Sequence, residues 1–240
     1  SRRSLLWNGR AKKNGAGGLS TMTSMWSGFK ESLIMILSAE VGDKTFFIAA
    51  IMAMRHSRGL VLSGALGALW IMTLMSAVFG SVAPRLISRT ITHWIATGMF
   101  FFFGLRSLYD SVIAWKDDGE SELAEVEAEL SGDLSKSPKL KRQMGIGRYL
   151  PPVFLEAFTL TFVAEWGDRS QLATIGLAAK GAVVGVTVGG CIGHSVCTGM
   201  AVLGGRYLAN TISERMVQIC GGTLFVLFGL HFAYSGPDLS

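Results

Sequence analysis

Long apolar stretches alternate with short polar connections along most of the chain. Crossing a hydrocarbon core takes roughly 20 helical residues, and stretches of that length lie at 29–54, 60–83, 91–115, 151–178, 181–204 and 211–234. Because a segment in lipid must satisfy its own backbone hydrogen bonds, and because these stretches are too long for barrel strands, each is predicted to be a helix. The pattern therefore predicts an all-α membrane protein with six transmembrane helices.

The segment at 116–150 interrupts this pattern with a run of charged residues. Acidic residues from Asp117 to Asp133 are followed by basic residues from Lys136 to Arg148. We interpret the segment as a soluble linker. Two roles remain open for it, a solvated connector and a regulatory loop that senses cations.

The sequence on one side of the linker is repeated on the other. LSAEVGDKTFFIAAIMA at 37–53 recurs as FVAEWGDRSQLATIGLA at 162–178, an offset of 125 residues, and the same offset pairs Gly64 with Gly189. Each half holds three predicted spans, an odd number, so the second half must enter the membrane from the opposite side. Inverted repeats of this kind place a substrate site near the midplane, where the halves meet, and indicate a transporter.

The predicted organisation has five parts. They are a basic N-terminal tail at 1–28, a first three-helix repeat at 29–115, the charged linker at 116–150, a second three-helix repeat at 151–235 and a C-terminal tail at 236–240. The net charge of +5 comes from Lys and Arg residues scattered over loops and the tail, so the lipid bilayer is the expected partner and nucleic acid is not. The oligomeric state stays open, with a homo-oligomer as one alternative.

Each half carries one acidic motif inside its first predicted span. EVGDKT at 40–45 and EWGDRS at 165–170 share the pattern Glu-x-Gly-Asp-basic-hydroxyl. Positions three apart share a face of a helix, so Glu40 and Asp43 are expected to point in one direction, and so are Glu165 and Asp168. The glycine of each motif allows either close helix approach or a local break that exposes carbonyl groups. If the halves meet at the motifs, four carboxylates converge.

Carboxylates at this depth point to a bound cation. An ionised acid at the centre of a span costs at least about 2.5–3.5 kcal/mol, so something must compensate it. Divalent cations such as calcium and manganese take oxygen ligands, whereas the absence of His and Cys from the motifs argues against zinc or copper. The predicted metal ligands are the four motif acids: Glu40, Asp43, Glu165 and Asp168. Neighbouring hydroxyl and amide oxygens are secondary candidates: Thr45, Ser170 and Gln171.

A purely structural interpretation pairs Glu40 with Lys44, and Glu165 with Arg169, at the spacing of a helix salt bridge. It leaves the aspartate of each motif without a partner, and an intramembrane ion pair contributes little that an apolar pair could not. We therefore keep Lys44 and Arg169 as secondary candidates that tune the pKa values of the carboxylates.

Three more polar residues are candidates for the pathway. Glu31 and Glu156 are related by the repeat and lie near span ends, which suits either a vestibule or simple interfacial solvation. His194 lies within the fifth span and either relays protons or packs as a lone polar residue between helices.

Grouped carboxylates also suggest how transport is driven. They repel one another, so some are expected to carry protons whenever no cation is bound, and binding a divalent cation then expels those protons. This predicts proton-coupled exchange. A passive divalent-cation channel and a membrane-embedded metal-assisted enzyme are the alternatives, but no nucleophile–base pair or cofactor motif supports an enzyme, and no cofactor is expected.

The two motifs, together with GHSVCTGMAVLGGR at 193–206, resemble those of the calcium:cation antiporter-2 family, and its eukaryotic Golgi members above all. The resemblance covers about residues 29–235. It implies exchange of manganese and calcium for protons across the Golgi membrane, with a plastid or vacuolar-type membrane as the alternative. It also implies that the metal-binding positions are Glu40, Asp43, Glu165 and Asp168, with Thr45, Ser170 and Gln171 as nearby contributors.

Overall fold

The computed structural model describes residues 22–113, 151–211 and 214–236, and every regular element within these ranges is a helix. The helices are residues 22–40, α2 (Lys44–Arg55), α3 (Arg58–Leu86), α4 (Arg89–Ile113), α6 (Pro152–Ala164), α7 (Arg169–Ala179), α8 (Val183–Thr211) and α9 (Glu214–Ser235). The predicted all-α class is confirmed for the part of the chain that the structure describes.

Three of the described helices are long and apolar enough to cross a membrane. They are Arg58–Leu86, Val183–Gly205 and Arg215–Ser235, and Pro152–Ala164 is a shorter apolar helix. Two of the six predicted spans, 29–54 and 151–178, are not continuous helices, because each is divided at its acidic motif. Each of these two predicted spans therefore consists of two helices, with the local break that the motif glycine allowed.

The helix divisions fall at equivalent places in the two halves. Residues 22–40 and α2 are separated by positions 41–43, and α6 and α7 by positions 165–168. After each divided helix come two long helices, α3 and α4 in the first half and α8 and α9 in the second. The element order of the first half thus recurs in the second.

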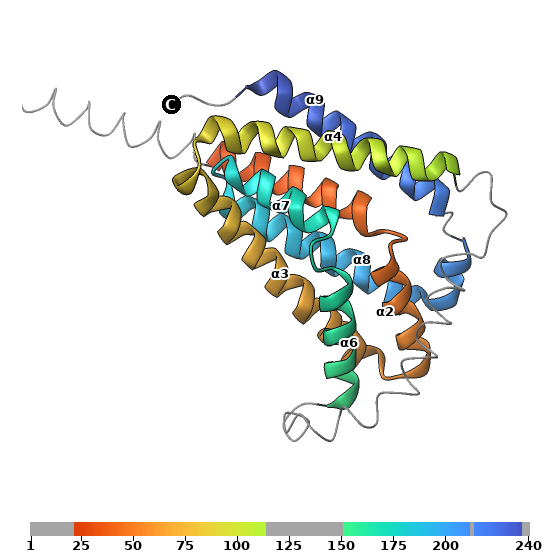
Figure 1. Cartoon of the computed structure of the whole chain (residues 1–240). Coiled ribbons are helices and arrows are strands. Elements are labelled where there is room, and N and C mark those ends of the chain that lie inside the picture. The colour runs from red at the N-terminus through yellow and green to blue at the C-terminus, as the bar shows by residue number, and fades with distance from the viewer. Residues whose placement is uncertain (1–21, 114–150, 212–213, 237–240) are drawn as a thin grey trace, which may run out of the picture.

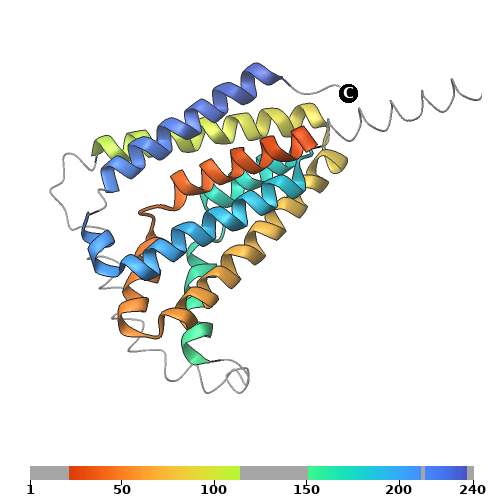
Figure 2. The same cartoon turned by 180° about the vertical axis from the view of Figure 1, so that it is seen from behind.

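The two halves are interleaved and not stacked as separate units. α3 packs against α6, α7 and α8 of the other half, α2 packs against α8, and α4 packs along α9 (Figures 1 and 2). In both views α4 and α9 lie side by side along one edge of the molecule, while α2 and α6 lie toward the opposite end. The divided helices are thereby enclosed by helices from both halves.

Two buried apolar clusters hold this arrangement together. One is built around α2, where every residue from Phe46 to Ala53 is buried, and it includes Ala157 and Val202 of the second half. The other joins Met35 to Phe100 and Phe225, so it connects the first helix with α4 and α9. Both clusters mix residues from the two halves, so close van der Waals packing joins the halves.

Two glycines let the halves approach closely, and they do so reciprocally. A methyl group on Gly64 of α3 would overlap the carbonyl oxygen of Phe154, and one on Gly189 of α8 would overlap the carbonyl oxygen of Phe29. Gly64 and Gly189 are related by the 125-residue offset, and so are Phe29 and Phe154. Each half therefore offers the other the same contact.

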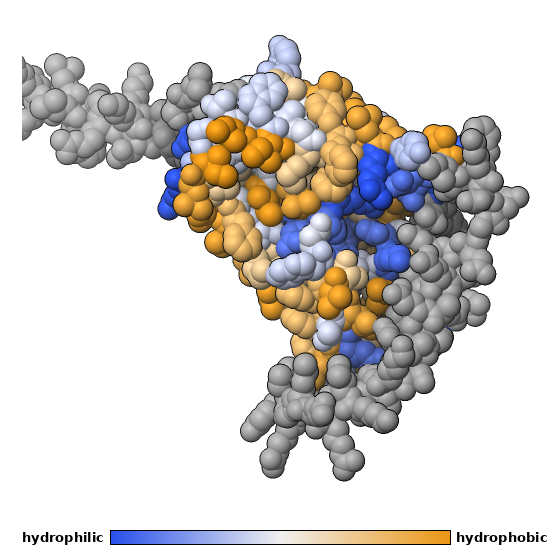
Figure 3. Space-filling view, viewed as in Figure 1, coloured by the Kyte–Doolittle hydropathy of each residue, from blue (hydrophilic) through white to orange (hydrophobic). Residues whose placement is uncertain are grey.

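The outer parts of the predicted organisation are described only in part. Residues 22–28, predicted to be part of the N-terminal tail, already belong to the first helix. The linker at 116–150, most of the N-terminal tail and residues 237–240 lie outside the described residues. Over the described part, apolar residues cover much of the face in Figure 3, and hydrophilic residues gather between α4 and α6.

Candidate metal site

The two acidic motifs form the same turn, and this turn ends one helix and starts the next. Gly42 has a φ of 77° and Gly167 a φ of 80°, a left-handed conformation that side chains disfavour. In each turn the aspartate N–H donates to the carbonyl of the motif glutamate, Asp43 to Glu40 at 3.3 Å and Asp168 to Glu165 at 3.2 Å. The aspartates then act as N-caps of α2 and α7.

This turn corrects the expected geometry of each motif. Positions three apart share a face only on a continuous helix, and the helix ends at the motif glutamate in both halves. The glutamate is therefore placed by the helix that ends, and the aspartate by the helix that begins. Of the two roles predicted for the motif glycines, the local break is the one found.

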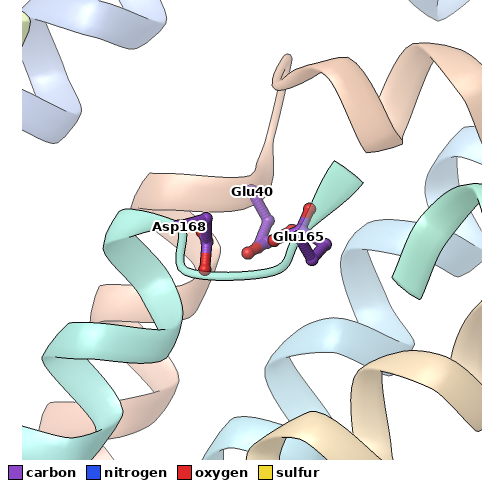
Figure 4. Close-up of side chains that lie close together, drawn as sticks. All are labelled: Glu40, Glu165 and Asp168. Carbon is purple, nitrogen blue, oxygen red and sulfur yellow. The ribbon is translucent and has the colours of Figure 1, made fainter. Parts of the chain in front are cut away.

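Three of the four predicted ligands converge. One carboxylate oxygen from each of Glu40, Glu165 and Asp168 lies within 4.8 Å of the others. Figure 4 shows these side chains pointing toward one another from the ends of two interrupted helices. Glu40 and Glu165 are both 3% exposed. Oε1 of Glu40 and Oε2 of Glu165 are buried without a hydrogen-bond partner, which is costly for a carboxylate unless a ligand or a proton compensates it.

Asp168 differs from the two glutamates because the backbone already uses both of its oxygens. Oδ2 accepts from the N–H of Ser170 and Oδ1 from the N–H of Gln171, each at 2.8 Å. A carboxylate oxygen has more than one lone pair, so these bonds orient Asp168 and still leave it able to bind a cation. The start of α7 thus holds one carboxylate rigidly beside two that lack such bonds.

The two motif hydroxyls lie in the site, each beside the glutamate of the opposite half. Ser170 lies beside Glu40 and Thr45 beside Glu165. Thr45 is 6% and Ser170 3% exposed, so both face the protein interior. The repeat relates Glu40 to Glu165 and Thr45 to Ser170. The contact that each hydroxyl makes with the glutamate of the other half is therefore again reciprocal.

Asp43 is the predicted ligand that the structure leaves outside the cluster. Its Oδ1 accepts from the N–H of Lys44 at 2.8 Å, and its Oδ2 lies 3.6 Å from Nη2 of Arg169. Arg169 was expected to pair with Glu165 four positions earlier. The helix break removes that spacing, and Arg169 reaches the aspartate of the other half instead.

Gln171 and His194 both lie near the cluster, with different roles. Oε1 of Gln171 accepts from the N–H of Gly167 at 2.7 Å, so this amide oxygen stabilises the turn. His194 is 4% exposed, and its Nδ1 lies 3.9 Å from Oε1 of Glu40, which places it at the site. Its role as a proton relay or as a packed polar residue stays a prediction.

The predicted vestibule residues, Glu31 and Glu156, lie outside the site. Glu31 accepts a hydrogen bond from the Ser27 hydroxyl at 2.7 Å and lines a cavity that also includes Lys180 and Phe232. Glu156 lies in α6 and is half-buried. Neither is part of the three-carboxylate cluster.

Two cavities meet the acidic motifs from different sides. A small one is lined by Glu165, Asp168, Ser170 and His194, together with α3 residues that include Thr73 and Ser76. A wide one of about 320 Å³ is lined by Gly42, Asp43, Arg169 and residues of α4 and α9. Glu165 and Asp168 thus line the small cavity, and Asp43 and Arg169 line the wide one.

Sequence reasoning missed one residue at this boundary. Ser107 of α4 accepts a hydrogen bond from Nη1 of Arg169 at 3.4 Å and donates to the carbonyl of Gln218 at 2.9 Å. Its counterpart in the repeat is Phe232, so the offset of 125 residues offers no signal for it.

The arrangement suits a hard divalent cation as a substrate. Carboxylate and hydroxyl oxygens are the ligands that calcium and manganese accept, and the three carboxylates come from both halves. Metal sites built from rigid and adjustable ligands together can release the ion when one half moves. The donor set therefore fits binding followed by release and needs no reacting nucleophile.

Comparisons with known proteins point the same way. A family model described as "Divalent cation/proton antiporter GDT1" matches residues 28–115 and 153–239. GDT1-like protein 5 from Arabidopsis thaliana is 50% identical over 230 residues, covering 90% of this chain and 100% of the relative. GDT1-like protein 3 from Oryza sativa subsp. indica is 51% identical over 210 residues, covering 86% of this chain and 73% of the relative. No solved structure matches the chain.

Proposed function

The chain belongs to the GDT1 family of divalent cation/proton antiporters, and from this membership we propose that it exchanges manganese or calcium for protons across an organelle membrane. The family consists of transporters, so the predictions of a transporter and not an enzyme, and of cations as substrates and not cofactors, are confirmed. With its apolar helices the chain is an integral membrane protein.

One observation carries the proposal for the site. Two buried glutamates, Glu40 and Glu165, each have one oxygen without a hydrogen-bond partner, and their carboxylates lie close to a third, that of Asp168. Such oxygens are rare in a folded interior unless something binds them. A divalent cation between the three groups would be held by both halves of the protein at once. Asp43, the fourth predicted ligand, would join when its contact with Arg169 opens.

Charge compensation links the cation to protons. Three negative charges within 4.8 Å of one another cannot remain together in a buried site without neutralisation. Either a divalent cation or protons can provide it. Exchange follows, because the site releases the cation only as it takes up protons, and releases protons only as it binds the cation.

The contacts between the halves support a six-span inverted repeat, in which the two divided helices count as one span each. Gly104 lies against Val226, and Gly229 lies against the ring of Phe101, which is another reciprocal pair at the offset of 125 residues. Together with the exchanged contacts of Gly64 and Gly189, this indicates a local two-fold relation between the halves. Alternating access would then exchange the roles of the two halves around the carboxylates.

The Golgi membrane is the proposed location, on the resemblance of the motifs to eukaryotic Golgi members of the family. Manganese is a cation that oxygen ligands bind, and the site holds carboxylates and hydroxyls of both halves. Imaging of the tagged full-length chain beside Golgi, plastid and vacuolar markers tests this. Co-localisation with either of the other two markers would replace the Golgi assignment and leave the exchange mechanism standing.

Uptake into proteoliposomes with an imposed pH gradient tests the function itself. We expect radioactive manganese and calcium to accumulate against their own gradients when protons can flow the other way, and to stop accumulating when a protonophore removes the pH gradient. Glu40→Gln and Glu165→Gln should abolish accumulation. Cation flux that ignores the pH gradient, or that survives in both variants, would contradict the proposal.

A further inference from the structure

Arg169 begins α7, but its guanidinium group contacts three other segments. Nη2 donates to the carbonyl of Ala39, at the end of the first helix, at 2.9 Å, and lies 3.6 Å from Oδ2 of Asp43. Nη1 donates to the hydroxyl of Ser107 on α4 at 3.4 Å, and that hydroxyl donates to the carbonyl of Gln218 on α9. One side chain therefore connects both helix breaks to the α4–α9 pair.

This connection lies at the wall of the wide cavity, and the chain neighbours of Arg169, Asp168 and Ser170, line the small one. The wide cavity is lined by Asp43, Arg169 and Ser107, and the small cavity by Glu165 and Asp168, and no residue lines both. The segments that Arg169 joins are the ones that would have to separate for an ion to pass from one cavity to the other. Arg169 is thus placed where a barrier is needed.

We propose that Arg169 is a positioning residue that closes the cation site towards the wide cavity between α4 and α9, and that ions pass through this cavity only when its contacts break. The proposal rests on the proposed function of the carboxylate cluster. Arg169 does not touch the cation in it. Instead it holds the end of the first helix and Asp43 in the closed arrangement.

Arginine suits this task because its guanidinium is planar and carries five donors in a fixed geometry. A lysine has one ammonium group on a flexible stem and cannot hold the Ala39 carbonyl, Asp43 and Ser107 in the same way. The side chains of Arg169 and Asp43 are 20% and 28% exposed, so water in the cavity weakens their attraction without removing it. An attraction of intermediate strength between Arg169 and Asp43 can hold the site closed and still break often enough for the site to open.

Accessibility of the site to a thiol reagent from the wide cavity tests the proposal directly. Ser170→Cys places a reporter beside Glu40 at a position that is 3% exposed, after the native Cys191, Cys197 and Cys220 have been replaced by alanine. The reconstituted protein is treated with a membrane-impermeant methanethiosulfonate reagent. The rate of modification then measures how often the barrier is open, and no transport is needed for the measurement.

Four variants in this background separate the closing role from general damage. Loss of a charge-assisted contact should make Arg169→Gln react about tenfold faster than the parent, and Ser107→Ala about threefold faster. The modification rate of Arg169→Lys should fall between those of the parent and Arg169→Gln, because lysine keeps the positive charge and lacks the planar set of donors of the guanidinium. Arg106→Gln is the matched control, since Arg106 lines the same cavity, is 66% exposed at its side chain and pairs with Asp110 at 3.5 Å on its own helix. Its rate should equal that of the parent.

The outcomes are decisive in either direction. Equal rates in the parent, Arg169→Gln and Ser107→Ala would overturn the closing role, and so would an equal acceleration in Arg106→Gln. If Arg169→Gln does not fold, Ser107→Ala still tests the same contact without altering any charge. If the wild-type chain moves no divalent cation but the rates differ as expected, the proposed function fails and the barrier stands, so the two failures are distinguishable.

Discussion

Trp70 donates a hydrogen bond to Ser195, the residue that corresponds to it in the second half. Nε1 of Trp70 lies 3.3 Å from the Ser195 hydroxyl and 3.2 Å from the carbonyl of Cys191. Two residues related by a two-fold axis can touch each other only close to that axis. The contact therefore supports a local two-fold relation whose axis passes between α3 and α8.

The first prediction concerns cation affinity. Glu40→Gln and Glu165→Gln should each weaken manganese binding to the purified protein by at least about tenfold, because even residues behind the ligands of a metal site usually contribute tenfold or more. Isothermal titration calorimetry measures this without transport. The two variants should be affected to a similar extent, since the glutamates occupy equivalent positions.

Asp110→Asn is the control for this measurement. Asp110 is an acid of the wide cavity, paired with Arg106 on the same helix, and it lies outside the cluster. We expect the Asp110→Asn variant to bind manganese as tightly as the wild type does. A loss of affinity in Asp110→Asn as large as in the glutamate variants would show that the glutamates act through the electrostatic field of the protein and not as direct ligands of the cation.

How far the sequence could predict this site depends on the kind of contact. The repeat and the two motifs identified Glu40, Glu165 and Asp168 correctly as residues that come together, because burying a charge in an apolar span demands a compensating partner. The helix breaks were only one of two alternatives, since a glycine in a span serves close packing, as at Gly64, as readily as a turn.

The contacts of Arg169 could not be predicted from spacing. Local rules apply to neighbours on one helix, and they led to Glu165 as the partner of Arg169. The actual partners, Asp43 and Ser107, lie in the other half, where only the packing of whole helices decides which side chains meet. Asp43, the fourth predicted ligand, lies outside the cluster for the same reason, because it contacts Arg169 of the other half.

The second prediction tests the helix break. Gly167→Ala should lower the free energy of unfolding by roughly 1–2 kcal/mol, the cost of placing a side chain in the left-handed region. A methyl group on Gly167 would meet no atom within 4 Å, so the cost is one of conformation and not of space. Thermal unfolding of the detergent-purified protein measures the change.

Gly98→Ala separates this effect from a general effect of the substitution. Gly98 lies in the interior of α4, and a methyl group there would also meet no atom within 4 Å. Because alanine favours a helix by about 0.8–1.0 kcal/mol over glycine, this variant should be at least as stable as the wild type. Equal destabilisation of both variants would show that the loss at Gly167 does not come from its left-handed conformation.

The third prediction tests the reciprocal packing of the halves. Gly64→Ala and Gly189→Ala should each destabilise the protein by about 1–3 kcal/mol, because the added methyl group overlaps the facing backbone. Gly199→Ala, where a methyl group meets no atom within 4 Å, should have little effect. A large loss at only one of the two related glycines would argue against a two-fold relation between the halves.

The last prediction concerns the two basic residues of the motifs. In an inverted repeat the opposite-facing conformation exchanges the roles of the halves, so Lys44 would then approach Asp168 as Arg169 approaches Asp43 here. Exchanging the bases in Lys44→Arg/Arg169→Lys should transfer the stronger closing contact to the other side of the site. The Ser170→Cys reporter should become more reactive from the wide cavity and less reactive from the opposite face of the membrane.

The exchange should be incomplete, for a reason visible in the repeat. Ala39, which accepts from Arg169, corresponds to Ala164, so a backbone acceptor is kept, but Ser107 corresponds to Phe232, which has no hydroxyl. An arginine at position 44 would thus lose one of the three contacts that Arg169 makes. Arg169→Lys alone gives the comparison: if it changes both rates as much as the double variant does, Lys44 has no closing role on the opposite side.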